Sequence, residues 1–106
     1  MSYRKEKLYL AVSSLAAGTG TLRERFEEAY SVALARLRGE DFPEDELRRQ
    51  LLSIHNTLAK VLPIAERTGR LSFAMDALSE EQLQELAEQV LSLFHQTVRV
   101  EEINGG

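Results

Sequence analysis

Apolar residues recur at helical spacing along most of the chain, and four segments are predicted to be helices. They cover residues 4–17, 22–38, 43–62 and 79–98. Each carries apolar side chains at intervals of three and four residues, which places them on one face of an α-helix. The first two are joined by a very short turn, which favours antiparallel neighbours. The sequence therefore predicts one all-α domain over residues 1–106, an antiparallel four-helix bundle.

Capping residues and a proline set the expected helix boundaries. Thr21 and Glu24 have the spacing of a capping box, and so do Ser79 and Gln82. The second and fourth predicted helices should therefore begin directly after Thr21 and Ser79. Pro63 disfavours helical geometry in the residue before it, which predicts the end of the third helix.

Two segments carry weaker patterns. Within residues 64–78, positions 71–76 alternate as a strand would, but the segment also fits a short helical stripe. Because no second strand is available for pairing, we expect a short extra helix or an apolar strap across the bundle. Residues 99–106 have no capping signal and end in Asn-Gly-Gly, which predicts a frayed tail.

The composition excludes some classes of functional site. The chain has 43% hydrophobic and 28% charged residues, which is typical of a globular domain. It has no cysteine, which excludes disulfides, thiolate metal sites and cysteine nucleophiles. The longest apolar run, 8–12, is far shorter than the roughly 20 residues that span a bilayer. We therefore expect a cytoplasmic protein with no membrane partner.

Charge is distributed unevenly along the chain. The net charge is −4, and residues 63–106 carry −5 while residues 1–20 carry +2. The basic start and the acidic end are expected to attract each other, either within one chain or between two copies. Glu81, Glu85 and Glu88 form an acidic stripe on the last predicted helix. This stripe is either a solvated face or a docking surface for a basic segment, such as residues 4–7 of another copy.

A glycine-rich turn precedes the second predicted helix. Gly18 and Gly20 lead into Thr21, and a helix N-terminus with Arg23 or Arg25 nearby is able to bind an anion. An ordinary interhelical turn explains the same residues. No lysine follows at the spacing of a phosphate-binding loop, so this is a weak candidate site.

The two histidines suggest a second candidate site. His55 and His95 lie at the edges of the apolar faces of 43–62 and 79–98, and Tyr30 could join them in a pocket between these helices. A general base or a metal ligand is one interpretation, and boundary packing is the other. No metal-binding motif accompanies either histidine, so no metal or cofactor is expected.

Surplus apolar residues are the strongest functional signal. Val32, Leu34, Leu52 and Leu91 lie outside the main stripes of their helices and form a predicted second apolar face. Such a face serves a protein partner or a second copy, or else lies within a thicker core. Arginines near residues 36–49 alternate with acidic residues, which argues against a nucleic-acid partner.

These observations favour a small non-enzymatic interaction module, an adaptor, regulator or inhibitor. It would act by helix-face docking or by self-association as a homodimer. A ligand-binding or enzymatic bundle with the histidine-lined pocket is the alternative. A further alternative is an immunity-type inhibitor, which rests on analogy of fold and on the acidic stripe.

Overall fold

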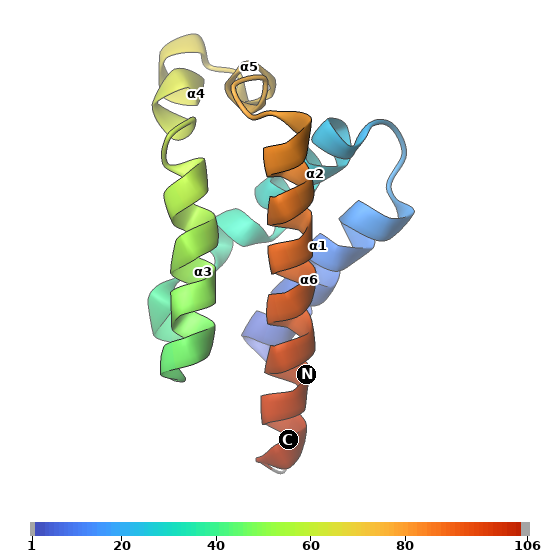
Figure 1. Ribbon diagram of the computed structural model, residues 1–106, viewed down its shortest axis with the longest axis vertical. Helices are drawn as coiled ribbons and strands as arrows, with labels where there is room; N and C mark the ends of the chain where they lie inside the picture. Colours follow the sequence, from blue (N-terminus) through green and yellow to red (C-terminus); the bar gives the residue numbers. More distant parts are fainter. Residues whose placement is uncertain (1, 105–106) are drawn as a thin grey trace.

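A computed structural model describes residues 2–104, and all regular secondary structure in that range is helical. The α-helices are α1 (Tyr3–Ala17), α2 (Leu22–Val32), α3 (Asp45–Leu58), α4 (Leu62–Thr68), α5 (Leu71–Met75) and α6 (Glu80–Ile103). Two 3-10 helices, η1 (Leu34–Arg36) and η2 (Gly39–Asp41), connect α2 to α3. The predicted all-α class is confirmed (Figure 1). No helix within residues 2–104 has the length and apolar character needed to cross a bilayer.

The two predicted capping boxes are both present. The Thr21 hydroxyl accepts from the Glu24 amide at 3.2 Å, and the Glu24 carboxylate accepts from the Thr21 amide at 3.1 Å. Ser79 and Gln82 make the equivalent pair at 3.0 and 2.8 Å. Each box satisfies amides that have no partner within the helix, so α2 and α6 begin where the sequence predicts.

The predicted helix over 22–38 is too long. α2 ends at Val32, because Ala33 leaves helical geometry with φ −140° and ψ −60°. The chain then forms η1, in which side chains three residues apart point the same way. Leu34 in η1 and Leu37 directly after it are both buried in the core.

The predicted helix over 43–62 is divided in two. α3 covers only Asp45–Leu58, and Pro63 lies in the first turn of α4 rather than ending α3. Proline is favoured at that place because the amide it lacks has no partner in a first turn. α4 ends at Gly69, whose φ of +69° is left-handed. α4 and α5 contact each other and form the short helical segment expected near 64–78.

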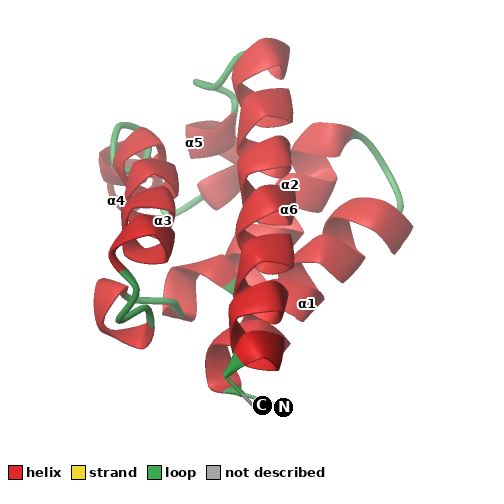
Figure 2. Cartoon of the chain, turned by 60° about the horizontal axis from the view of Figure 1, so that its bottom comes forward, coloured by secondary structure: helices red, strands yellow, loops and turns green. Residues whose placement is uncertain are grey.

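The core is organised around α6, the longest helix. α6 contacts α1, α2 and α3, and α1 also contacts α2. Figures 1 and 2 show α6 in the middle of the molecule, and in Figure 1 it runs antiparallel to α3. Its buried residues are Leu83, Leu86, Val90, Leu93 and Thr97.

The prediction of a frayed tail over 99–106 is wrong for the described part, because α6 continues to Ile103. Residues 105–106 lie outside the described range. The start of α1 and the end of α6 lie close together at one side of the molecule (Figures 1 and 2). There the Glu101 carboxylate accepts from the Ser2 hydroxyl at 2.7 Å and from Arg4 Nε at 2.8 Å. The attraction between the basic start and the acidic end therefore operates within one chain.

Arg4 joins three parts of the fold at this place. Its two terminal nitrogens donate to the Glu44 carboxylate at 2.5 and 3.0 Å, and its guanidinium lies 5.4 Å from the centre of the Phe42 ring. The hydrogen bonds from Arg4 lower the pKa of Glu44 below its ordinary value. Burial opposes the ionisation of Glu101, but hydrogen bonds from Arg4 and Ser2 outweigh it and lower the pKa of Glu101. We call Arg4, Glu44 and Glu101 the terminal ion cluster.

We predict that Arg4→Gln destabilises the fold by about 1–2 kcal/mol near neutral pH, because charge-assisted hydrogen bonds are lost from a partly exposed site. The two carboxyls have folded pKa values below the ordinary 4.5. Their contribution is complete above that value and disappears as the pH falls through the folded pKa values. Urea unfolding followed by circular dichroism should therefore show the gap between wild type and Arg4→Gln closing in acid. An equal gap at neutral and acidic pH would contradict this account.

Candidate docking surface

A groove of about 330 Å³ lies between α1 and α6. Most of its lining is apolar, and only Gln84 and Glu88 are polar. The lining residues are Val12, Leu15, Ala16, Leu22, Gln84, Ala87, Glu88 and Leu91. The groove exists because the two helices pack through their buried faces and leave the flanks of both facing outward.

Exposed apolar side chains extend the groove along both helices. Leu91 is 44% exposed on α6, and Tyr9 is 52% exposed on α1. The Tyr9 ring lies 6.4 Å from the Phe94 ring, so α1 and α6 also meet beyond the groove. A continuous apolar strip on the outside of a small protein is typical of an interaction site. We call the groove lining together with Tyr9 and Phe94 the α1–α6 surface.

The acidic stripe borders this surface. Glu81, Glu85 and Glu88 are all exposed on α6, and Glu88 also lines the groove. None of the ion pairs found within residues 2–104 involves these three carboxylates. The stripe thus lies beside an apolar groove with its charge unpaired within the chain.

The predicted second apolar face is partly wrong. Leu34 is fully buried, because η1 turns it into the core, and so it is unavailable to a partner. Val32, Leu52 and Leu91 are exposed as expected. Leu52 lies in a shallow depression along α3 with Arg49 and His55, whereas Leu91 lines the α1–α6 groove. These residues therefore belong to different surfaces.

The candidate anion site at Gly18, Gly20 and Thr21 is filled by the chain itself. The Glu24 carboxylate already accepts from the Thr21 amide. Arg23 instead reaches the junction of α5 and α6, where it donates to the carbonyls of Met75 and Leu78 and pairs with Glu80 at 3.1 Å. Arg23 consequently links α2 to the end of α5 and the start of α6, and the expectation that it serves an anion is not supported.

The histidine pocket is not formed by the predicted residues. His55 Nε2 lies 2.8 Å from the Leu37 carbonyl oxygen, and His55 therefore joins α3 to the end of η1. His95 is exposed, with its ring 6.1 Å from that of Phe94. Tyr30 is half-buried, and this burial raises the pKa of its hydroxyl. Within residues 2–104, no cluster of three or more histidine or carboxylate side chains is arranged to hold a metal ion.

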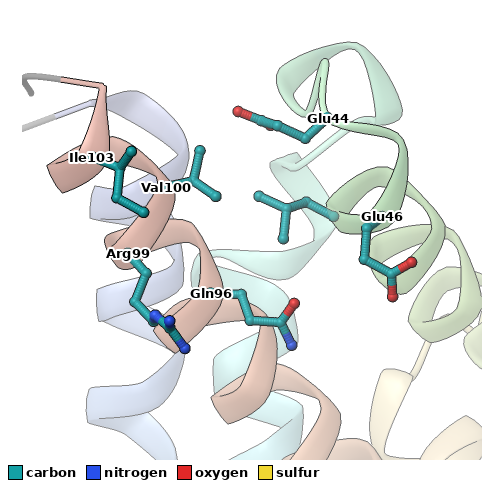
Figure 3. Close-up of a pocket in the computed structure, with 7 residues that line it drawn as sticks. Glu44, Glu46, Gln96, Arg99, Val100 and Ile103 are labelled. Carbon is teal, nitrogen blue, oxygen red and sulfur yellow. The ribbon is translucent and has the colours of Figure 1, made fainter.

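The seam between α3 and α6, where that pocket was expected, has two hollows of about 420 and 300 Å³. Figure 3 shows the larger, with Val100 and Ile103 of α6 across from Glu44 and Glu46. The smaller is lined by Glu46, Gln50, Ser53, Gln89 and Ser92. A 2.8 Å hydrogen bond from Gln50 to Gln96 bridges the helices. His55, His95 and Tyr30 line neither hollow.

The sequence does not distinguish several groove residues from core residues. Val12, Leu15 and Leu22 have the spacing of buried positions, and in the structure they are only half-buried. For Val12 and Leu15 the available signal was the width of the apolar stripe on α1, which exceeds what a single neighbour can cover. Ala16 and Ala87 are small residues and gave no signal of a groove.

Comparisons with known proteins do not indicate a function for this chain. No protein-family model matches this chain, and no match was found among curated proteins or solved structures. The function therefore has to be inferred from the geometry of the chain itself.

We predict opposite outcomes for two leucines that the sequence placed on one face. Leu34→Glu should cost at least about 3 kcal/mol, because it buries an unpaired carboxylate. Leu91→Gln should change the free energy of unfolding by no more than about 0.5 kcal/mol, because the site is exposed. Thermal and urea unfolding of both variants measures the difference. A folded Leu34→Glu variant of wild-type stability would contradict the burial of Leu34.

Proposed function

We propose that this chain is a non-enzymatic interaction module that docks a helix of another protein onto the α1–α6 surface. The observation that carries the proposal is the exposed apolar groove between two helices, with Leu91 at its edge. A seam between two helices is the usual place for a third helix, whose apolar residues fill the hollow at spacings of three, four and seven residues. The proposal keeps the predicted antiparallel four-helix bundle, with α1, α2, α3 and α6 as its members, as the scaffold for docking.

Rigidity of the two groove helices supports docking with little ordering cost. The terminal ion cluster links the start of α1 to the end of α6. The groove itself lies toward the other end, where α2 packs against both helices. A surface held at two places loses little conformational freedom on binding, which favours affinity.

Charge favours a foreign partner over a second copy. A symmetric dimer through this groove would bring the two α6 helices together, with the acidic stripes of both copies close to each other. The basic start of a second copy is also engaged within its own chain, because Arg4 and Lys5 pair with Glu101, and Lys7 Nζ lies 5.7 Å from the centre of the Tyr3 ring. Self-association through this surface is therefore disfavoured.

The test compares Leu91→Arg with Leu52→Arg, two exposed leucines on different surfaces. The tagged wild type and both tagged variants are purified, together with any bound partner, from cells that express the protein. The masses of the complexes are then measured by native mass spectrometry. We expect a stoichiometric partner whose binding falls at least about tenfold with Leu91→Arg, since hot spots lie in such pockets. The Leu52→Arg variant should bind the partner as the wild type does. A partner lost only with Leu52→Arg, or a wild type that forms only a homodimer, would contradict the proposal.

A further inference from the structure

The chemistry of the partner follows from the charge beside the groove. We infer that the α1–α6 surface takes a basic amphipathic helix, with apolar residues on the face that enters the groove and Lys or Arg along the flank beside α6. The inference rests on the proposed docking function and adds the character of the partner to it.

The spacing of the acidic stripe predicts the spacing of basic residues on the partner helix. Glu81, Glu85 and Glu88 follow one another at intervals of four and three residues on α6. At a rise of 1.5 Å per residue, they extend over about 10 Å, or two turns. A helix lying alongside α6 would meet all three carboxylates with basic residues at the same intervals of three and four.

Among the residues that the structure describes, no basic side chain forms an ion pair with this stripe. Arg4 and Lys5 pair with Glu101, and Arg4 also with Glu44. Arg23 is the basic residue of α2 that reaches the start of α6, and its guanidinium pairs there with Glu80. The three carboxylates also repel one another mildly at this spacing. Basic residues of a partner would relieve that repulsion as well as attract the stripe.

The groove determines the other face of the partner. Ala16 and Ala87 are the small residues of its lining, while Val12, Leu22 and Leu91 provide larger apolar walls. Small residues on both helices allow a partner helix to approach closely, and a large apolar side chain can enter between them. A peptide with basic residues but no apolar face would therefore gain only weak, salt-screened attraction.

The experiment uses three synthetic helical peptides of about 18 residues, five turns each. The first has a leucine face flanked by lysines, the second replaces the lysines with glutamates, and the third replaces the leucines with serines. Fluorescence anisotropy measures the affinity of each for the full chain, and amide chemical shifts map the binding surface. We expect the first peptide to bind at least about tenfold more tightly than the second, because three exposed ion pairs each contribute modestly. The shifts should centre on Val12, Ala87 and Leu91.

Two matched variants separate a specific stripe from general acidity. The stripe variant combines Glu81→Gln, Glu85→Gln and Glu88→Gln. The control variant combines Glu28→Gln, Glu40→Gln and Glu66→Gln, which are exposed glutamates elsewhere on the chain. Both variants change the net charge equally and keep good helix-forming side chains in the helices. The stripe variant should lose about tenfold in affinity for the lysine peptide, while the control should bind it nearly as wild type does.

Each failure has a distinct meaning. Equal affinity for the lysine and glutamate peptides, with shifts still in the groove, would overturn the basic partner and leave the docking function standing. If the stripe and control variants lose the same affinity for the lysine peptide, the net charge of the chain explains the binding. This result would also overturn the inference. Two results would overturn both the inference and the proposed function. The first is that the two leucine peptides do not change the amide chemical shifts of the groove residues, and the second is that Leu91→Arg does not lower their affinity.

Discussion

Burial of one face of α6 is the constraint on which the rest of the structure depends. Leu83, Leu86, Val90 and Leu93 are at most 1% exposed, and α6 contacts α1, α2 and α3. None of the shorter helices would be stable alone, because a few turns cannot repay the cost of helix nucleation. Packing onto α6 provides the apolar burial that makes them fold. The long central helix thus fixes where α1, α2 and α3 lie, and the shorter elements pack on those helices or on each other.

The same constraint produces the α1–α6 surface. A helix that serves as the centre of a small fold keeps one side in solvent, and α6 uses that side for the acidic stripe. α1 covers only part of the next side, so the α1–α6 groove stays open between Leu91 and Val12. The terminal ion cluster then holds the two helices together at their far ends. One surface thereby combines an apolar groove, an acidic edge that makes no ion pair within residues 2–104, and two helices linked at their far ends.

Local patterns predicted those parts of the fold that depend on neighbouring residues. The helical class and the starts after Thr21 and Ser79 follow from spacing and from hydrogen bonds made within one turn. The acidic stripe was likewise predicted as an exposed face. The errors concern distant partners. The end of α6 is held by Arg4, which is 97 residues away in sequence from Glu101, and no local signal reports that contact. Leu34 enters the core only because η1 replaces the last turns of α2.

The central claim is that α1 and α6 form one rigid surface, because the terminal ion cluster links the start of α1 to the end of α6. Native-state amide hydrogen exchange over 99–103 tests it most directly. If the claim holds, these amides exchange slowly in the wild type, nearly as slowly as those in the middle of α6, and much faster in Arg4→Gln. Exchange at the rate of an unfolded chain in the wild type would show that the end of α6 is frayed and that α1 is not fastened to it. The α1–α6 surface would then lack the rigidity that the proposed docking requires.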